Sequence, residues 1–286
     1  MITKINNQAY QKRESLNSEN YFTIQELLAL PPLFNFIDCV IDNKTKFQMF
    51  LAGNDDGVAL RFFWNSYYEK KTLNTWSKLA SKAKGYILDI GAHTGVFSLA
   101  AMASNSNVNV ISFEPHFMNF SRLLLNFRAN QFLNFNAFMF CVGDKNSLVP
   151  FSISTDINYL TTGGSVGNRN DGTSLSIQQI ALDKFLPIDV IKNVSLIKMD
   201  VEGYEPHCLN GMHNLLELGA TIFFECINSE SGQKVQEILS KYKYKFYEID
   251  DLAETINPVD KIVAHFNDGK VLMNRINRIA SIKPIF

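Results

Sequence analysis

A short glycine-containing segment carries the clearest sign of a ligand-binding site in this sequence. The residues ILDIGAHTG, from Ile87 to Gly95, predict a strand followed directly by a helix. The strand would end at Asp89 or Ile90, and Gly91 would allow a tight turn where a side chain would block a ligand. The helix would begin at Gly95, and its first backbone amides have no partner within the helix. In an open parallel sheet such a turn lies at the crevice where ligands bind.

Several interpretations compete for this turn. A dinucleotide-binding fingerprint would read G-x-G-x-x-G, whereas this turn offers G-x-x-x-G with Asp89 two residues before the first glycine. That carboxylate would repel a pyrophosphate, but it would suit a cationic ligand with an amino group. A P-loop would need G-K-[ST], which is absent here. The remaining alternative is a glycine turn that only caps the helix.

The next two expected strands also end in residues that suit a nucleoside. The second ends at Glu114, whose carboxylate can accept hydrogen bonds from both hydroxyls of a ribose, and Pro115 then stops the strand. The alternative for Glu114 is an acid facing a helix N-terminus. The third strand is expected to end at CVGD, where Asp144 either accepts from an adenine amino group or lies in a surface turn. The candidate cofactor-binding residues are therefore Asp89, Gly91, Ala92, His93, Gly95, Glu114, Pro115, Val142, Gly143 and Asp144.

The sequence combines D-x-G-x-x-x-G after the first expected strand with an acidic residue at the end of the second. This combination resembles the layout of S-adenosylmethionine-dependent methyltransferases. Over residues 85–228 the sequence resembles the FkbM family of these enzymes, through ILDIGAHTGVFSLA, ISFEP, and LIKMDVEGYE with CLNGM. The most specific block is D-x-E-G-x-E at the end of the fourth expected strand, followed by L-x-G. The lead-in IALD, residues 180–183, also matches, whereas His93 stands where the family shows Asn. The resemblance implies S-adenosylmethionine as cofactor, S-adenosylhomocysteine as product, and O-methylation, often of a hydroxyl on a sugar or secondary metabolite.

The acids after the fourth expected strand suit methyl transfer to an alcohol. A positioned base that removes the alcohol proton is commonly worth about 10²–10⁴-fold in rate. Asp200 lies at the carboxyl end of that strand, nearest the transferred methyl, and is the predicted base. Glu202 follows before the turn at Gly203 and is the second catalytic candidate. For Glu202 and Glu205 the alternative is to cap the next helix, and we expect one of them to do so.

A metal site is a weaker interpretation of the same acids. Asp200, Glu202 and Glu225, with His207 as a further candidate, could hold Mg²⁺ through oxygen ligands, but no spacing rule demands it. The prediction therefore assigns no metal. Lys198 lies within an apolar strand and cannot stay unpaired there. We expect it to form a buried ion pair with Glu225 rather than to act as a catalytic amine.

The elements that must position these residues alternate between strand and helix. Apolar runs at residues 86–90, 108–113, 137–142, 196–201 and 221–226 predict strands covered on both faces, and residues 95–103, 117–127 and 205–218 predict helices between them. This rhythm predicts a doubly wound, mostly parallel α/β sheet, Rossmann-like, with seven strands and an antiparallel last strand. Residues 1–84 form an expected N-terminal cap, and residues 85–286 the expected methyltransferase domain. Residues 155–174 are expected to form a long loop.

Composition excludes several classes of protein. The chain has 286 residues, of which 46% are hydrophobic and 19% charged, so it is not intrinsically disordered. A net charge of −1 disfavours nucleic acid as the main partner. The residues from Met1 to Asn20 lack an apolar run and no stretch is apolar enough to span a membrane, so we expect neither a secretory signal nor a transmembrane segment. The four cysteines are widely spaced, as in reduced, buried cysteines. We therefore expect a soluble, cytoplasmic protein.

The sequence as a whole predicts a class I methyltransferase that acts on a small-molecule or carbohydrate acceptor. The N-terminal cap and the loop at residues 155–174 are the expected determinants of acceptor choice. One alternative is an NAD-dependent oxidoreductase, which the missing third glycine and Asp89 argue against. The other is a binding protein that keeps the fold without turnover, which the carboxylates at Asp89, Glu114 and Asp200 argue against.

Overall fold

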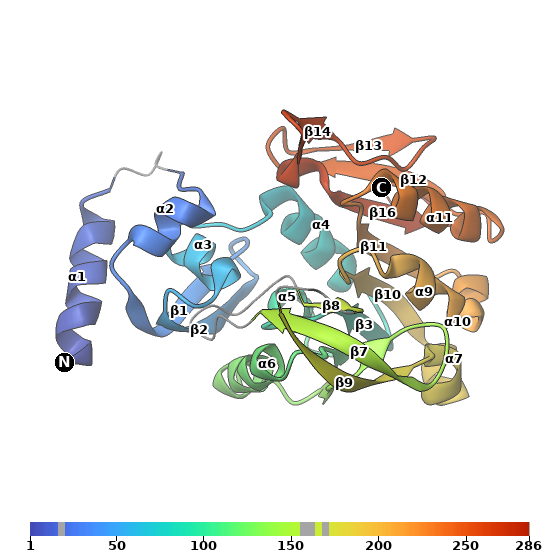
Figure 1. Cartoon of the computed structure of the whole chain (residues 1–286), viewed down its shortest axis with the longest axis horizontal. Coiled ribbons are helices and arrows are strands. Elements are labelled where there is room, and N and C mark those ends of the chain that lie inside the picture. Colours follow the sequence, from blue (N-terminus) through green and yellow to red (C-terminus); the bar gives the residue numbers. More distant parts are fainter. Residues whose placement is uncertain (17–20, 155–163, 168–171, 286) are drawn as a thin grey trace.

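The structure is a computed structural model that describes residues 1–16, 21–154, 164–167 and 172–285. Within these residues the largest sheet has eight strands in the order β13-β12-β16-β11-β10-β3-β4-β5 (Figure 1). Strands β11, β10, β3, β4 and β5 run parallel, whereas β16 is antiparallel to both of its neighbours, β11 and β12. The strands of this sheet are β3 (Tyr86–Ile90), β4 (Asn109–Phe113), β5 (Phe135–Phe138), β10 (Val194–Met199), β11 (Thr221–Glu225), β12 (Lys245–Asp250), β13 (Thr255–Val259) and β16 (Asn277–Ser281).

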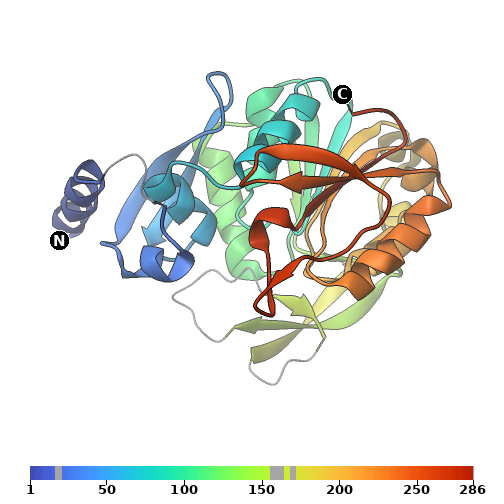
Figure 2. The ribbon, with the colours of Figure 1, turned by 90° about the horizontal axis from the view of Figure 1, so that it is seen from above.

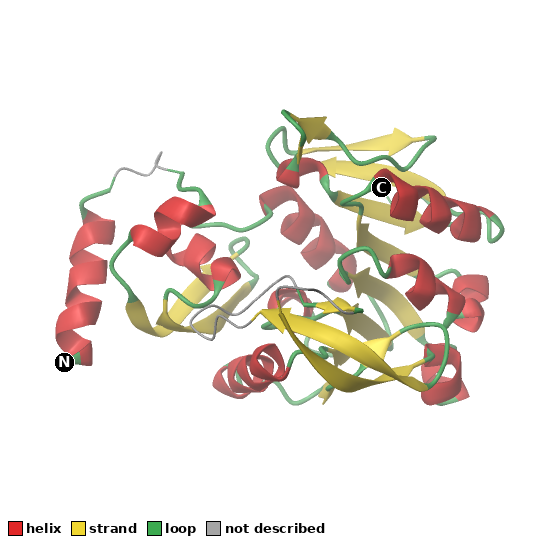
Figure 3. Ribbon diagram, in the orientation of Figure 1, coloured by secondary structure: helices red, strands yellow, loops and turns green. Residues whose placement is uncertain are grey.

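Helices cover both faces of the sheet because successive residues of each buried strand point to opposite sides. Ile87 of β3 and Val110 of β4 belong to one hydrophobic cluster, together with side chains of α4, α5 and α6. Leu88 and Ile111, the next residue of each strand, belong to a second cluster with side chains of α7, α9, α10 and α11. The two layers of helices are seen on either side of the strands in Figures 2 and 3. These helices are α4 (Lys70–Ala80), α5 (Val96–Ser104), α6 (Phe117–Ala129), α7 (Leu182–Phe185), α9 (Glu205–Asn210), α10 (His213–Leu218) and α11 (Ser229–Ser240).

The order of the strands creates a crevice in the middle of the sheet. The chain enters at β3, moves outward through β4 to β5, and returns to β10 on the other side of β3. The strand order therefore reverses between β3 and β10, and ligands bind at such a reversal, beyond the carboxyl ends of the strands. The predicted doubly wound, Rossmann-like sheet and its antiparallel last strand are confirmed. The sheet has one strand more than the seven expected, because β13 pairs with β12 at the edge.

Two predicted elements are interrupted. Residues 137–142 are not one strand, because β5 ends at Phe138 and β6 (Cys141–Val142) pairs instead with β9 of another sheet. Residues 205–218 are not one helix, because the chain breaks between α9 and α10 at Gly211 and Met212. At Gly211 a Cβ atom would collide with the carbonyl oxygen of Gly143, so close backbone packing causes the break.

A second sheet of four strands is inserted between β5 and α7. Its order is β6-β9-β7-β8, with antiparallel pairing of β7 to β9 and to β8. The predicted long loop at 155–174 is wrong at residues 165–166 and 172–174, which are strand, and its segments 155–163 and 168–171 lie outside the described residues. The new strands are β7 (Ser147–Ser154), β8 (Ser165–Val166) and β9 (Gly172–Ile180), and α8 (Ile188–Ile191) follows α7 before β10.

The segment before β3 folds against the sheet on the side of the first hydrophobic cluster. Its α2 begins at Thr23, whose hydroxyl and the Glu26 carboxylate form a capping box. Leu33, Leu51 and Phe63 share the cluster that contains Ile87 of β3. Figure 1 shows these elements, in blue, gathered at one side of the molecule. They are α1 (Ile2–Glu14), α2 (Ile24–Ala29), β1 (Leu33–Val40), β2 (Lys46–Gly53) and α3 (Gly57–Asn65), and α4 follows them.

The C-terminal part adds a small hairpin before the last strand. It consists of β14 (Phe266–Asn267) and β15 (Lys270–Val271), followed by a 3-10 helix, Met273–Arg275. Across the described part of the chain, no helix combines the length and the apolar character that crossing a membrane requires. The four cysteines are free and buried, as predicted.

Candidate active site

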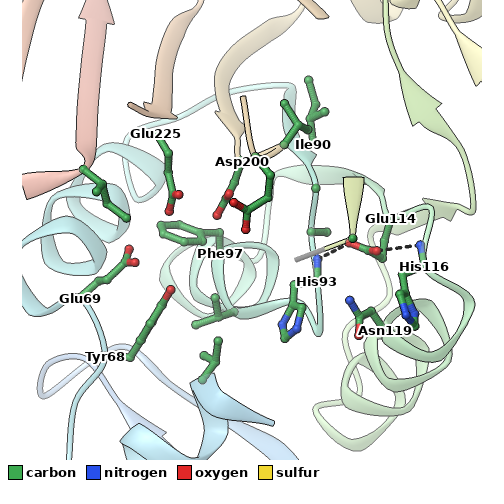
Figure 4. A pocket seen from close by; sticks show the side chains of 18 of the residues that line it. Tyr68, Glu69, Ile90, His93, Phe97, Glu114, His116, Asn119, Asp200 and Glu225 are labelled. Atoms are coloured by element: carbon green, nitrogen blue, oxygen red, sulfur yellow. Dashed lines mark hydrogen bonds between the residues drawn. The ribbon is translucent and has the colours of Figure 1, made fainter. Parts of the chain in front are cut away.

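A cavity of about 750 Å³ opens at the carboxyl ends of β3, β4, β10 and β11. This volume lies within the usual range of ligand-binding pockets, roughly 300–1,000 Å³. Figure 4 shows two groups of side chains in it, one around Glu114 and the other around Asp200, Glu225 and Glu69. The cavity therefore has two halves, which we call the Glu114 half and the Asp200 half.

The turn after β3 forms the floor between the two halves. The amides of Gly91 and Ala92 both donate to the carbonyl oxygen of Phe113, over 2.8 and 3.0 Å, and Gly91 has a φ of +78°. A Cβ atom at Gly91 would lie far closer to the Asp200 carbonyl oxygen than van der Waals contact allows. The predicted tight turn at Gly91 is therefore present, wedged between the ends of β4 and β10.

Glu114 is held rigidly at the wall of the cavity. Its carboxylate accepts one hydrogen bond from the amide of His93 (2.7 Å) and another from the amide of His116 (2.8 Å). Burial raises the pKa of Glu114 to about 7, against the effect of these two hydrogen bonds. The side chain of Asn119 is a third hydrogen-bond partner of this carboxylate, whose two oxygens have about four acceptor positions in all. The neighbouring Nε2 atom of His93 is buried and has no partner among the described residues.

Asp89 lies elsewhere than the sequence suggested. It is not among the residues that line the cavity, and its side chain is 1% exposed. One carboxylate oxygen accepts from both the amide (3.0 Å) and the hydroxyl (2.5 Å) of Ser98 in α5. Burial raises the pKa of Asp89 to about 6, and the hydrogen bonds from Ser98 partly offset this. The carboxylate thus anchors α5 to β3 instead of facing a ligand.

Some of the other predicted cofactor residues line the cavity, and some lie outside it. Ala92, Pro115 and Val142 line the cavity, whereas Gly143 and Asp144 do not. Asp144 is exposed and receives only a long hydrogen bond, 3.3 Å, from Gln179. Because β6 leaves the main sheet, the third strand does not bring Asp144 to the cavity edge.

Gly95 also lies outside the cavity lining, directly before α5. It has a φ of +101°, and a Cβ atom there would press against the side chain of Leu123 in α6. Its role is therefore in packing α5 close to α6.

The Asp200 half is organised around one buried cation. Lys198 is fully buried, and its Nζ atom lies 3.3 Å from Asp200 Oδ2, 3.9 Å from Glu225 Oε1 and 4.7 Å from the centre of the Phe97 ring. Burial by itself would lower the pKa of Lys198, but the surrounding carboxylates raise it above its ordinary value. For Glu225, burial and then Asp200 raise the pKa well above its ordinary value. The predicted ion pair of Lys198 with Glu225 is confirmed, and Asp200 lies closer still.

The turn after β10 brings Asp200 and Glu202 to the cavity but turns Glu205 away. Asp200 and Glu202 line the cavity. Glu205 is buried, and its carboxylate accepts from the amides of Val201 (3.3 Å) and Gly203 (3.2 Å). Glu205 is thus the acid that stabilises the turn before α9, in the role expected for one of the two.

The proposed metal ligands do not gather around a common point. Among the described residues, no group of three His, Cys, Asp or Glu side chains is arranged to hold a metal ion. Between Asp200 and Glu225 lies the ammonium group of Lys198. His207 is exposed, outside the cavity lining, and stacks on the ring of Tyr204 with 4.2 Å between centroids.

The sequence analysis missed the residues that both ends of the chain bring to the cavity. From the N-terminal segment come Tyr67, Tyr68 and Glu69, and from the segment after β12 come Asp251 and Asn274. These residues are far from β3 and β10 in sequence, and no motif surrounds them. The local sequence around Tyr67, Tyr68 and Glu69 is rich in aromatic residues from residue 61 to residue 76, which by itself indicates packing.

A sheet of this strand order, with a glycine turn at the crevice and an acid at the tip of β4, defines a class I S-adenosylmethionine-dependent methyltransferase. A model of the methyltransferase FkbM domain matches residues 89–252, which is more than half of the chain. The chain therefore belongs to the FkbM methyltransferase family. No curated protein sequence matches it.

Solved structures with a similar fold are methyltransferases of low sequence identity. A precorrin-6y C5,15-methyltransferase from Geobacter metallireducens is 14% identical, over 77% of this chain and 90% of that one, with a TM-score of 0.44. An S-adenosylmethionine-dependent O-methyltransferase from Thermotoga maritima is 14% identical, over 75% and 65%, with a TM-score of 0.40. A tRNA (uracil-54, C5)-methyltransferase from Pyrococcus abyssi, in complex with S-adenosyl-L-homocysteine, is 14% identical, over 86% and 44%, with a TM-score of 0.40.

The residues of the Glu114 half fit this cofactor. Glu114 would hold the ribose hydroxyls through its carboxylate, and Gly91 leaves the space that a Cβ atom would fill. Phe140 and Val142 provide apolar walls for a base, and the unpartnered Nε2 atom of His93 offers a further polar contact. The cofactor supplies a methyl group on a positively charged sulfur.

Replacement of Glu114 should weaken cofactor binding. We expect Glu114→Gln to lower the affinity for S-adenosylhomocysteine roughly 10–100-fold, because hydrogen bonds to a charged group contribute about 1.5–3 kcal/mol. Isothermal titration calorimetry measures this affinity, with Glu237→Gln on the exposed face of α11 as the matched control. An unchanged affinity in Glu114→Gln would mean that this carboxylate does not contact the ribose.

Proposed function

We propose that this methyltransferase methylates a hydroxyl group. The acceptor we propose is a sugar or glycan precursor, and the broader class to which it belongs includes secondary metabolites. The observation that carries the proposal is that the cavity is lined by carboxylates together with tyrosine rings. Carboxylates accept hydrogen bonds from hydroxyls, and aromatic rings pack against the apolar faces of sugar rings. The residues concerned are Tyr21, Tyr67, Tyr68, Glu69, Asp200, Glu225, Asp251 and Glu254.

Two tyrosines at the cavity support an acceptor larger than a small metabolite. Tyr21 and Tyr67 stack with 6.0 Å between ring centroids and 25° between planes. They are 59% and 41% exposed, although large aromatic rings usually bury most of their surface. Such exposed rings at the entrance of a cavity suit the stacking of a sugar ring.

The charged side chains that line the cavity favour an acceptor without phosphate groups. Among the described residues that line the cavity, the only lysine is the exposed Lys70, which is already paired with Glu254 at 2.5 Å. Arg61 donates to the carbonyl oxygen of Gly57 and lies over the ring of Tyr68. Binding of a nucleic acid backbone requires an excess of available cations, so we propose a neutral acceptor and no nucleic acid partner. A cytoplasmic location stays a prediction.

In the proposed reaction, Asp200 and Glu202 contact the acceptor next to the transferred methyl. A carboxylate that accepts a hydrogen bond from the acceptor hydroxyl fixes one of its lone pairs toward the methyl carbon, and alignment of this kind supplies a large part of the rate. Phe97, Ile90 and Val96 line the same cavity and keep water away from the reacting atoms. The expected effect of Asp200→Asn is therefore a loss of turnover with cofactor binding intact.

A methyl-transfer assay tests the proposal. The protein is incubated with methyl-labelled S-adenosylmethionine and a panel of neutral methyl hexosides, amino sugars, sugar phosphates and short RNA, and products are located by mass spectrometry. We expect methyl ethers of neutral sugars. Methylation only of RNA or of amines would overturn the O-methylation proposal. Chelation that abolishes turnover, with recovery on adding Mg²⁺, would add a metal to the site.

A further inference from the structure

Glu69 occupies the N-cap position of α4 but does not cap it. Acidic side chains at an N-cap ordinarily accept hydrogen bonds from the first free amides of the helix. The side chain of Glu69 makes no such bond. Asp251 takes that role, since its carboxylate accepts from the amide and the hydroxyl of Thr72, each over 2.8 Å. The carboxylate of Glu69 is thereby released from the helix.

The released carboxylate points into the Asp200 half of the cavity. Figure 4 shows it on the same side as the carboxylates of Asp200 and Glu225, above Tyr68. Its Oε2 atom accepts a hydrogen bond of 3.0 Å from the Asn277 side chain at the start of β16. The backbone of Glu69 is left-handed, with a φ of 38°, which costs free energy in any residue with a side chain. Such backbone strain concentrates at functional sites, where the surrounding structure enforces it.

Asp200, the base predicted from the sequence, already forms an ion pair with Lys198. It is the nearer of the two carboxylates within ion-pair distance of the buried Lys198. The other carboxylate, Glu225, lies farther from Lys198, at 3.9 Å, and burial and then Asp200 raise its pKa well above its ordinary value. If Asp200 took a proton, the buried ammonium would lose its closer anionic partner. Glu69 forms no ion pair of this kind, because its hydrogen-bond partners are the neutral side chains of Asn277 and Tyr68.

We propose that Glu69 takes the proton of the acceptor hydroxyl during methyl transfer, while Asp200 orients that hydroxyl. This inference rests on the proposed O-methylation. The hydroxyl oxygen forms a bond to the methyl carbon, and the bond between that carbon and the cofactor sulfur breaks, with its electron pair remaining on sulfur. The O–H bond breaks at the same time, and the proton moves to a carboxylate oxygen of Glu69. Charge balances, because the sulfonium and the carboxylate both become neutral.

The surroundings of Glu69 suit a proton acceptor that works near neutral pH. Desolvation in the cavity raises the pKa of Glu69 to about 7, which Lys198 opposes and Asp251 and Asp200 reinforce. The other titratable groups that face it are Tyr68 beside it and Glu225 of β11. A general base is most effective when its pKa lies near the working pH.

The first test uses Glu69→Gln, which keeps the size of the side chain and its hydrogen bond to Asn277. With a methyl hexoside that the wild type methylates, we expect kcat to fall roughly 10²–10⁴-fold. The affinity for S-adenosylhomocysteine should stay the same. The wild-type kcat should rise with pH through about 7, and this dependence should disappear in the variant. The matched control is Glu230→Gln in α11, far outside the cavity lining.

The second test needs no acceptor. Because the folded pKa of about 7 exceeds the ordinary value of 4.5, Glu69 stabilises the fold below that ordinary value and loses this contribution as pH rises through about 7. Glutamine does not titrate. Between about pH 5 and about pH 8, the urea midpoint of the wild type should therefore fall relative to that of Glu69→Gln.

The outcomes separate this inference from the proposed function. A wild type that makes methyl ethers and a Glu69→Gln variant that makes them equally fast would overturn the role of Glu69 alone. A midpoint difference that does not change with pH would also overturn it. A wild type that methylates no hydroxyl under any condition would overturn the proposed function, and the role of Glu69 with it.

Discussion

Replacing Gly91 by alanine should abolish cofactor binding and destabilise the protein by more than about 4 kcal/mol, a loss reserved for severe backbone and packing defects. Two effects add at this position. A side chain at a φ of +78° costs about 1–2 kcal/mol. The new Cβ atom would also collide with the carbonyl oxygen of Asp200, which belongs to the backbone at the end of β10 and cannot rotate away. Urea unfolding and calorimetry with S-adenosylhomocysteine measure the two losses.

Gly269 provides the matched control, because it shares the backbone conformation without the collision. Its φ is +73°, and a Cβ atom there would meet nothing within 4 Å. Gly269→Ala should therefore cost only the conformational part, about 1–2 kcal/mol, and leave cofactor binding unchanged. Equal losses in the two variants would show that the close approach of the turn to β10 contributes nothing.

Replacing Lys198 by methionine should destabilise the protein by about 3–5 kcal/mol at neutral pH, because it leaves buried carboxylates without their cation. The same substitution should remove methyl transfer, since Asp200 would lose the ammonium group that lies 3.3 Å away. The loss of stability should shrink as pH falls. The pKa values of Glu69 and Glu225 are already raised by burial, and without Lys198 these groups would be neutral over a wider range. Unfolding curves at about pH 5.5 and about pH 8 measure the difference.

Lys234→Met is the control for this experiment, since Lys234 forms an exposed ion pair with Glu230 and should change stability little. In addition, Lys198→Met combined with Glu225→Gln should recover part of the stability, because one of the stranded acids is removed with its partner. A Lys198→Met protein as stable as the wild type at about pH 8 would contradict the importance of the buried pair.

The parts of the site that the sequence predicted well are those formed by consecutive residues. The glycine turn, the acid at the tip of β4 and the ion pair of Lys198 follow from strand ends and apolar periodicity, which local sequence carries. The main sheet follows from the same alternation. Asp89 differs because Ser98, in the first turn of α5, donates two hydrogen bonds to its carboxylate. A contact of that kind depends on how α5 packs on β3.

The parts that the sequence did not predict depend on contacts between distant segments. The break at Gly211 exists because the chain packs against Gly143, and nothing in the run from residue 205 to 218 reveals that neighbour. Asp144 misses the cavity because β6 pairs with β9, a strand that comes about thirty residues later by sequence position. Glu69 was missed because Asp251, which caps α4 in its place, and Asn277, which donates to its carboxylate, are both far from it in sequence.

The place of β16 has a consequence for the synthesis of the protein. This strand, Asn277–Ser281, lies between β11 and β12 and pairs with both of them in the finished sheet. Until it has been made, a growing chain that has already formed β11 and β12 has two unpaired strand edges where the sheet should be continuous. Unpaired edges of this kind favour aggregation. The side chain of Asn277 also donates to Glu69, so completion of the sheet and completion of the cavity both wait for the synthesis of β16.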